Sequence, residues 1–395
     1  MDLNDLLLGA VKSGATDLHL KLGRPPILRR DGSLVPVENW NALTPADLES
    51  VLATVTAVNR QKEADFRATG ELDIAYTSND LTRYRVNGFL QRGAISFAFR
   101  IIPKEIPSFA ELRMPKGVQR LAAEHRGLVL VTGATGSGKT TTLAAMLGHI
   151  NETRRQHIVT IEDPIEILHE DKACIVNQRE VGLDTQSFQQ ALRRALRQDP
   201  DVILIGELRD AETAETALQA AESGHLVFST MHTVDAAETI GRMTEFFPGV
   251  KQTQIRSILA GVLRGVVSQR LLPRVGGGRV AAVEVMVTNA RIGDLIRENR
   301  PDEISDAIEE GDFFDMQSFG QALIKLVIAG EIDREVAANA STNKHDFLVA
   351  LERAEKQQTA DTRAADDAAR KEAEAQAAAG QMTPGLRVVQ EPTAP

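Results

Sequence analysis

The chain has 395 residues, of which 43% are hydrophobic but only 4% aromatic, so its core must be built mainly from aliphatic side chains. A formal net charge of -10 argues against nucleic acid as the main partner, because non-specific binding to phosphates depends on Lys and Arg. The one cysteine, Cys174, excludes a disulfide framework and a cysteine-rich zinc site, and we expect it to be a buried thiol.

The first residues, MDLNDLLLGAVKSG, differ from a secretion signal, because they carry acids where a signal peptide has a basic region. Apolar stretches stay well below the roughly 18 residues that a membrane-spanning helix needs. These features predict a soluble cytoplasmic protein that docks at a membrane only through another protein.

Residues 1–112 are predicted to form one α+β domain. LNDLLLGAVKSG predicts a short amphipathic helix that ends at Gly14, and the alternation in DLHLKLG predicts a strand. Asp31 and Gly32 form a predicted hairpin turn between two further strands. A stretch at the end of this domain contains three prolines and predicts a linker that runs to about residue 116: Pro103, Pro107 and Pro115.

A second hairpin is predicted within this domain from RYRVNGFLQRGAISFAFRIIP. The alternation of its first strand points Arg83 and Arg85 outward and Tyr84 and Val86 inward. The outward arginines are either solvent-facing charges or ligands for an anion, and the residues alone leave both possibilities open.

Residues 117–352 are predicted to form an α/β domain with a parallel-rich sheet. Short apolar runs alternate with helical segments, which is typical of parallel strands with crossover helices. The predicted strands are GLVLVTG, HIVTIED, DVILIGE, HLVFSTMHT and AAVEVMV. Apolar residues at helical spacing predict one core-facing helix over residues 143–150 and another over residues 255–267.

Residues 353–395 form a predicted tail. The stretch from residue 353 to about 381 has no aromatic residue and no apolar stripe, so we expect either a solvated helix or disorder there. The last residues, TPGLRVVQEPTAP, are predicted to be disordered.

The stretch GATGSGKT matches the phosphate-binding pattern GxxxxGK[ST] and lies between a predicted strand and a predicted helix. Glycines let backbone N–H groups surround a β-phosphate, Lys139 adds a positive charge, and the Thr140 hydroxyl can bind Mg²⁺. We therefore expect ATP and Mg²⁺ to bind at these residues: Gly133, Thr135, Gly136, Ser137, Gly138, Lys139, Thr140 and Thr141.

Hydrolysis also needs a group that activates water, and two predicted strand ends are acidic. These are TIEDPIE, with Glu162 and Glu166, and DVILIGELRD, with Glu207. Gly206 stands where such sites usually have a metal-binding Asp, so Glu207 is the expected working acid.

Two histidines flank the predicted strand in GHLVFSTMHT. His232 follows the strand, at the edge where ligands of α/β sheets gather, and could contact a γ-phosphate. For His225, at the opposite end, a structural and a functional role both remain open.

Taken together, TIEDPIE, IGELRD and GHLVFSTMHT resemble the Asp box, Walker B and His box of secretion-type ATPases. The stretch from Asn177 to Asp210, with GGGRVAAVEVMV and GATDLHLKLGRPPILRRDG, resembles the type IV pilus retraction ATPases of the PilT and PilU group. The resemblance covers about residues 1–350. It implies a RecA-like ATPase core behind a PAS-like N-terminal domain.

The same resemblance implies a homohexameric motor in the cytoplasm, docked on an inner-membrane pilus platform protein and working beside a second retraction or assembly ATPase. It assigns catalytic roles to Glu207, Glu166 and His232, nucleotide contact to His225, and a metal contact to Glu166 beside Thr140. Arginines from a neighbouring N-terminal domain reach the triphosphate in this family. The matching candidates are Arg83, Arg85 and Arg100.

One stretch departs from the family pattern. ARIGDLIRE keeps part of a motif tied to retraction, but Gly293 stands at its arginine position. This leaves the motor in place, and it leaves open whether the chain is the main or an accessory retraction ATPase.

Three other functions compete with pilus retraction. A pilus or type II secretion assembly ATPase usually has a four-cysteine zinc motif and a further N-terminal domain, which the single cysteine and the short N-terminus disfavour. The acidic net charge disfavours a RecA-like motor that translocates nucleic acid. Lys139 and Glu207 together disfavour a scaffold that binds nucleotide without hydrolysing it.

Overall fold

The computed structural model describes residues 2–30, 32–102 and 105–380. Asp31 of the predicted turn, Pro103 of the predicted linker and residues 381–395 of the predicted tail lie outside these ranges. The chain divides into two compact units, and the first comprises residues 1–271 and 279–319. The second unit comprises residues 272–278 and the described residues from Gly320 onward.

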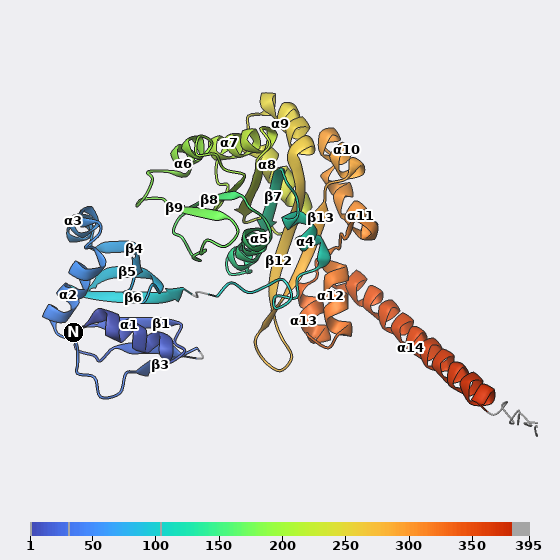
Figure 1. Cartoon of the computed structure of the whole chain (residues 1–395), viewed down its shortest axis with the longest axis horizontal. Coiled ribbons are helices and arrows are strands. Elements are labelled where there is room, and N and C mark those ends of the chain that lie inside the picture. Colours follow the sequence, from blue (N-terminus) through green and yellow to red (C-terminus); the bar gives the residue numbers. More distant parts are fainter. Residues whose placement is uncertain (1, 31, 103–104, 381–395) are drawn as a thin grey trace, which may run out of the picture. The chain divides into compact units, whose positions relative to one another are not determined.

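The N-terminal part of the first unit is an antiparallel sheet with three helices, which confirms the α+β prediction (Figure 1). Its strands run in the order β3-β2-β1-β6-β5-β4. The predicted second hairpin is β5 with β6, and Tyr84 and Val86 are fully buried. The elements are α1 (Leu3–Lys12), β1 (Asp17–Lys21), β2 (Ile27–Arg30), β3 (Ser33–Pro36), α2 (Pro45–Val55), α3 (Arg60–Thr69), β4 (Glu71–Thr77), β5 (Arg83–Gln91) and β6 (Ala94–Ile102).

The remainder of the first unit is built on a second, largely parallel sheet with the order β13-β12-β7-β11-β10-β8-β9. Every pair from β12 to β9 is parallel. Only residues 274–278 join β12 to β13, too few for a parallel crossover, so these two strands are antiparallel. The strands are β7 (Gly127–Thr132), β8 (His157–Glu162), β9 (Ile175–Glu180), β10 (Val202–Ile205), β11 (Leu226–Met231), β12 (Leu263–Pro273) and β13 (Arg279–Val287).

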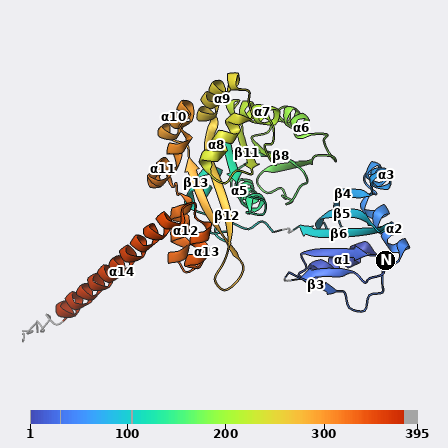
Figure 2. The same cartoon turned by 180° about the vertical axis from the view of Figure 1, so that it is seen from behind.

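Helices cover both faces of this sheet. Adjacent residues of a strand point to opposite faces of the sheet, so Ser268 of β12 points to one face and Gln269 points to the other. Gln269 donates from Nε2 to Thr142 Oγ1 of α5 at 2.8 Å, which places α5 on one face (Figure 1). Helix α8 lies on the other face (Figure 2). The helices are α4 (Lys116–Ala122), α5 (Lys139–Thr153), α6 (Phe188–Ala195), α7 (Ala211–Glu222), α8 (Ala236–Glu245), α9 (Gly249–Val262), α10 (Ala290–Glu298) and α11 (Ile304–Glu309), with short turns η1 (Pro301–Glu303) and η2 (Asp312–Phe314).

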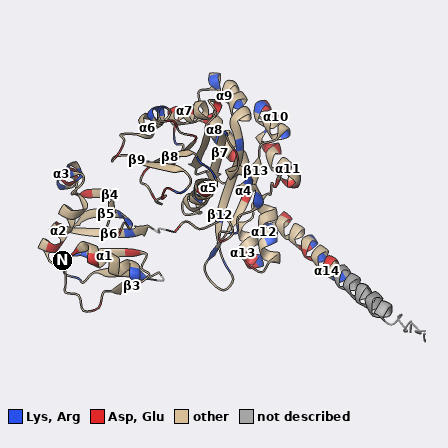
Figure 3. Ribbon diagram, viewed as in Figure 1, with Lys and Arg blue, Asp and Glu red and all other residues tan. Residues whose placement is uncertain are grey.

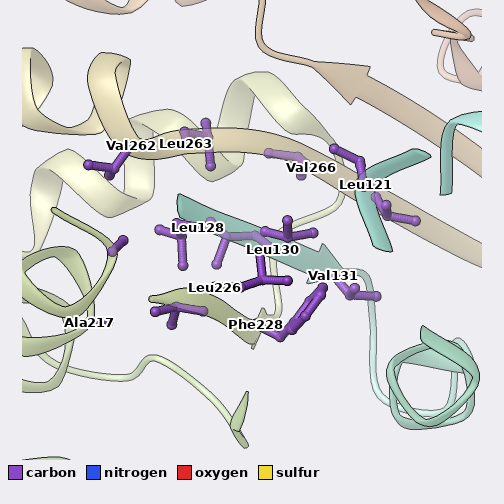
Figure 4. Packing of buried hydrophobic residues seen from close by; sticks show 14 of the residues in the cluster. Leu121, Leu128, Leu130, Val131, Ala217, Leu226, Phe228, Val262, Leu263 and Val266 are labelled. Atoms are coloured by element: carbon purple, nitrogen blue, oxygen red, sulfur yellow. The ribbon is translucent and has the colours of Figure 1, made fainter. Parts of the chain in front are cut away.

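The core between these layers is aliphatic, as the composition predicts. Figure 4 shows side chains of β7, β11 and β12 packed side by side, with Leu121 of α4 at one end of the cluster. Leu128, Leu226 and Leu263 are each 0% exposed. Full burial of one such side chain contributes about 1.5–3 kcal/mol to stability, so these central strands anchor the sheet.

The predicted helix over residues 255–267 is wrong in its last third. Helix α9 ends at Val262, and Leu263 begins the strand β12. A central strand buried on both faces has a continuous apolar run, which a short window cannot tell from a buried helix. At Gly265 a Cβ would lie 2.4 Å from the Met286 oxygen, so only glycine lets β12 and β13 approach this closely.

The second compact unit contains α12 (Phe319–Ile328), α13 (Arg334–Ala340) and α14 (Lys344–Gly380). Of the two forms expected for residues 353–380, the structure has the helix. Phe347 and Leu351 are buried, while the described side chains beyond them are exposed or half-buried. Acidic and basic residues alternate along this part of α14 (Figure 3), where Arg334 of α13 pairs with Glu352 at 3.2 Å.

Cys174 is buried, as predicted, and its Sγ lies 3.2 Å from the Arg154 carbonyl oxygen. Burial raises the pKa of this thiol. Within the described ranges, no helix combines the length and the apolar character that a membrane crossing requires.

The burial pattern of α14 makes its contribution to stability testable. Ending the chain after Gln357 removes only exposed or half-buried described side chains, so we expect an unfolding free energy within about 1 kcal/mol of the full chain. Leu351→Ala empties a fully buried position and should cost about 2–5 kcal/mol. Urea unfolding followed by circular dichroism compares them, and a truncated chain as unstable as Leu351→Ala would contradict this view of α14.

Candidate functional site

Four parallel strands bring the predicted motifs to one edge of the second sheet. Thr132 at the end of β7 lies opposite Met231 at the end of β11. Ile205 at the end of β10 lies beside Ser229 of β11 and Ile161 of β8. Since parallel strands all point the same way, the segments that follow them gather at this edge (Figure 1).

The glycine loop leaves β7 in a conformation that depends on glycine. Gly133, Gly136 and Gly138 have φ angles of 138°, 78° and 97°, which side chains rarely tolerate. At Gly133 a Cβ would also lie 2.5 Å from the Gln269 oxygen, whereas at Gly136 nothing lies within 4 Å. The loop is therefore pressed against β12 at its start and open at its centre.

Helix α5 begins with its N-terminal backbone groups free of side-chain caps. Gly138 is the N-cap residue, and among the described residues α5 has no capping hydrogen bond from a side chain. The first N–H groups of such a helix, with the partial positive charge of its dipole, form a site for an anion. The buried hydroxyl of Ser137 has no hydrogen-bond partner among the described residues and lies at the same place.

Lys139 is held at the loop in a partly buried position. Its Nζ donates to the carbonyl oxygens of Gly133 at 2.7 Å and Ala134 at 3.1 Å. Burial lowers the pKa of Lys139, and the negative charges of Glu207 and Glu166 act in the opposite direction. Both carboxylates are thus close enough to Lys139 to affect its charge, which brings three predicted residues together.

Glu207 follows β10 and lies in a nearly closed environment. Its side chain is 14% exposed, and its Oε2 is buried with no hydrogen bond within the described chain. Arg209 forms an ion pair with Oε1, and His232 Nε2 lies 3.5 Å from Oε2. The pair with Glu207 raises the pKa of Arg209. A buried carboxylate oxygen without a donor is a group that can accept a proton from water.

The acids after β8 lie beside this group. Glu162 is buried and accepts hydrogen bonds from Thr160 at 2.6 Å and Gln178 at 3.1 Å. Burial raises the pKa of Glu162, and these hydrogen bonds act against the rise. Glu166 is exposed. Over the described ranges, no cluster of three or more His, Cys, Asp or Glu side chains could hold a metal ion by itself.

His225 lies away from the loop. It precedes β11, whose six residues span about 20 Å, and the loop follows the opposite end of the neighbouring β7. Its Nδ1 lies 2.9 Å from Ser223 Oγ and 3.0 Å from the Ala220 carbonyl oxygen. The structure does not bring His225 to the glycine loop of its own chain.

The three arginines of the N-terminal sheet have different surroundings. Arg83 forms an ion pair with Glu180 of β9, and both side chains are largely buried. Arg85 of β5 lies directly opposite Arg100 of β6. Such like-charge pairs are unfavourable, and Asp17 offsets this one by pairing with Arg100 at 3.1 Å.

Two residues of the site, Arg209 and Gln269, were not predicted from the sequence. Arg209 stands two residues after the predicted acid, a spacing that could have identified it as a partner for that carboxylate. Gln269 is 1% exposed and binds Thr142, while its backbone oxygen faces Gly133. It was missed because its strand was taken for the end of a helix.

Known proteins share this arrangement. A family model described as "Type II/IV secretion system protein" matches residues 3–277, which include the glycine loop and the ends of β8, β10 and β11. The chain is 45% identical over 348 residues to the type IV pilus retraction ATPase PilT of Pseudomonas aeruginosa, covering 88% of this chain and 100% of that protein. It is 39% identical over 353 residues to the type IV pilus ATPase PilU of the same organism, covering 89% and 91%. A crystal structure of the pilus retraction motor PilT with bound ADP matches with a TM-score of 0.82 at 44% identity, covering 88% of this chain and 98% of that one.

The contrast between two loop glycines gives a matched test. Gly133→Ala combines an unfavourable φ with a Cβ 2.5 Å from a backbone oxygen, while Gly136→Ala has only the φ strain, about 1–2 kcal/mol. We expect Gly133→Ala to melt at a lower temperature than Gly136→Ala and to lose most of the melting-temperature rise that ADP produces. Thermal scans with and without ADP measure both effects. Equal melting temperatures for the two variants would contradict the close contact with β12.

Proposed function

The chain belongs to the type II/IV secretion system protein family and is an ATPase, and from this premise we propose that it is a hexameric motor whose ATP hydrolysis powers retraction of type IV pili. The observation that carries the proposal is the meeting of Lys139 and Glu207 at one sheet edge, beside an uncapped helix start. The identity of 45% to PilT over that protein's whole length supports retraction as the task.

In this proposal ATP binds with its phosphates in the glycine loop. Backbone N–H groups from Gly136 to Thr141 surround the β-phosphate, and Lys139 exchanges its two carbonyl partners for phosphate oxygens. The Ser137 hydroxyl, which lacks a protein partner within the described chain, gains one there. Thr135 lies in the exposed part of the loop, where it can close over the nucleotide.

The residues at this edge fit a magnesium ion that arrives with ATP. Thr140 is in the first turn of α5 and would hold the ion through its hydroxyl, with Glu166 on the same side. The phosphates would supply further oxygens. Mg²⁺ supplies positive charge that neutralises the phosphate oxygens.

Glu207 acts as the base in this proposal. It orients the attacking water and takes its proton through the buried oxygen that has no donor. Arg209 holds the other oxygen through its ion pair, and His232, whose Nε2 lies 3.5 Å from the buried oxygen, would contact the γ-phosphate. An amide at position 207 would keep the shape and lose the capacity to accept a proton.

We assign residues 117–352 to a RecA-like ATPase domain, residues 1–112 to a PAS-like domain and residues 353–395 to a tail. In a ring, the N-terminal domain of one subunit would bring arginines to the triphosphate of the next. The opposed pair Arg85 and Arg100 suits this role best, because two like charges held side by side are stabilised by an anion. Closure and release of that domain would convert hydrolysis into motion.

The partners follow from the proposed task. A retraction motor works in the cytoplasm against an inner-membrane platform protein, and a second retraction or assembly ATPase would share that platform. Nucleic acid is disfavoured as a partner, because a chain with a net charge of -10 is repelled by phosphates. The single cysteine disfavours the zinc-containing assembly motors.

One observation favours an accessory rather than a stand-alone retraction motor. Gly293 is buried in α10, and a Cβ there would lie 3.7 Å from the Ala260 oxygen of α9. This is ordinary contact distance, so glycine is not required by packing at that position. Its presence where the retraction group has an arginine is therefore a candidate functional difference.

The proposed roles of Lys139 and Glu207 can be separated by kinetics. Lys139→Ala should lose nucleotide binding and hydrolysis together, since it removes the charge that contacts the phosphates. Glu207→Gln should bind ATP with near-normal affinity and hydrolyse it about 100-fold more slowly or worse. Fluorescent-nucleotide titration and phosphate release measure the two properties. Near-normal turnover by Glu207→Gln would show that another group activates the water.

Deletion of the gene tests the direction of the motor. Cells without this protein should keep or gain surface pili and lose retraction-driven movement, and the wild-type gene should restore movement while the Glu207→Gln gene does not. Pilus counts by electron microscopy and measured retraction give the result. A matched gene carrying Glu245→Gln, an exposed change at the end of α8, should restore movement fully. Bald cells after deletion, restored by the wild-type gene, would identify an assembly motor instead.

A further inference from the structure

A buried carboxyl group on β13 has no part in the site described above. Glu284 is 6% exposed, and its neighbours along β13 from Val280 to Val287 are all apolar. Its Oε1 accepts a hydrogen bond of 2.9 Å from the backbone N–H of Ala236, the first residue of α8. Glu284 therefore fixes the start of the helix that follows the His232 segment.

The same carboxyl group lies near Ser268 of β12, which is hydrogen-bonded to the end of β7, the strand that leads into the glycine loop. Ser268 of β12 is fully buried, and its hydroxyl lies close enough to Glu284 to favour the ionised form of that carboxyl group. Thr132, the last residue of β7, donates from Oγ1 to Ser268 Oγ at 3.0 Å. The hydroxyl groups of Ser268 and Thr132 thus lie between Glu284 and the start of the glycine loop at Gly133.

The segment from His232 to Asp235, which precedes α8, is attached to that helix by its own hydrogen bonds. Asp235 caps α8 by accepting from the N–H of Glu238, and the hydroxyls of Thr233 and Thr239 lie 2.6 Å apart. Movement of the start of α8 would therefore carry the whole segment from His232 to Asp235 with it. The chain from Thr132 to Ala236 runs on the face of the sheet opposite α5.

A requirement for stability alone does not explain an acid at this position. Burying a carboxyl group is unfavourable, and an amide or an apolar side chain would fill the same space at lower cost. Burial raises the pKa of Glu284 to about 7, and the nearby Asp235 acts in the same direction. The Ala236 N–H, the charge of Arg270 and the Ser268 hydroxyl favour the ionised form.

We propose that Glu284 is a positioning residue for ATP hydrolysis. It holds the segment from His232 to Asp235 in place relative to β7, the strand that leads into the glycine loop. The inference rests on the proposed function of the glycine loop and Glu207. As a carboxylate, Glu284 accepts from the Ala236 N–H with a full negative charge and attracts the Ser268 hydroxyl. When Glu284 is protonated, it loses this charge and becomes a weaker acceptor, so the start of α8 is held less firmly.

Ionisation of Glu284 should lower the stability of the folded chain and raise the rate of ATP hydrolysis. In the unfolded chain Glu284 has its ordinary pKa near 4.5, so between about pH 4.5 and 7 the folded chain holds a proton that the unfolded chain has released. The stability of the folded form therefore falls as the pH rises through this range. Turnover should rise over the upper part of the same range, because the carboxylate forms there.

Glu284→Gln separates these effects, since glutamine has nearly the same shape and stays neutral. The variant should be more stable than wild type at pH 8, yet hydrolyse ATP roughly tenfold more slowly or worse, because misplacing a group by about 1 Å can cost 100-fold. Its turnover should lack the rise near pH 7 that wild type shows. Affinity for ATP should change less than twofold, because Glu284 touches no residue of the glycine loop.

The experiment measures turnover, ATP affinity and melting temperature of the full chain from pH 5.5 to 8.5. Glu245→Gln, the same exchange at an exposed position of α8, is the control and should match wild type in all three. Ser268→Ala, which removes the middle link, should slow turnover, and combining it with Glu284→Gln should add little to the effect of Glu284→Gln alone.

Two results would overturn the inference. One is a Glu284→Gln variant whose turnover and pH profile match those of wild type. The other is a variant that is slower and also less stable at pH 8, since that would indicate a structural role only. Wild-type chain that fails to hydrolyse ATP would instead refute the proposed function itself.

Discussion

The constraint on which the rest of the structure depends is the parallel pairing of β7, β8, β10 and β11. Parallel strands all end at the same edge, so residues far apart in the sequence must meet there. Lys139, Glu207 and His232 are contributed by segments that follow three of these strands. The apolar strands therefore have two roles at once: their burial stabilises the fold, and their direction assembles the site.

Polar groups near that edge are arranged in layers of decreasing contact with solvent. The glycine loop is open at its centre, Glu207 is nearly closed off, and Glu284 is buried one strand beyond β12. Each step inward makes a charge more costly and its hydrogen-bond partners more important. This gradient explains why the outer residues suit contact with a ligand and the inner ones suit control of position.

Patterns with a local cause could be predicted from the sequence. The glycine loop, the strand and helix that flank it and the hairpin of Tyr84 were all predicted, because spacing along the chain determines them. The strand β12 was missed because both of its faces are buried, and Glu284 was missed because one acid in an apolar strand has no local signature. The opposition of Arg85 to Arg100 depends on pairing between strands. Only tertiary structure supplies that information.

The burial of Cys174 has a practical consequence for experiments on motion. A thiol reacts as its thiolate, and this one is enclosed, hydrogen-bonded to backbone oxygens and has a raised pKa. Because no other cysteine exists in the chain, a cysteine introduced at the surface would be the single reactive position. Fluorescent dyes or spin labels could then be attached to each sheet in turn without first removing a native residue. The chain is thus already suited to spectroscopic measurement of how its parts move during a nucleotide cycle.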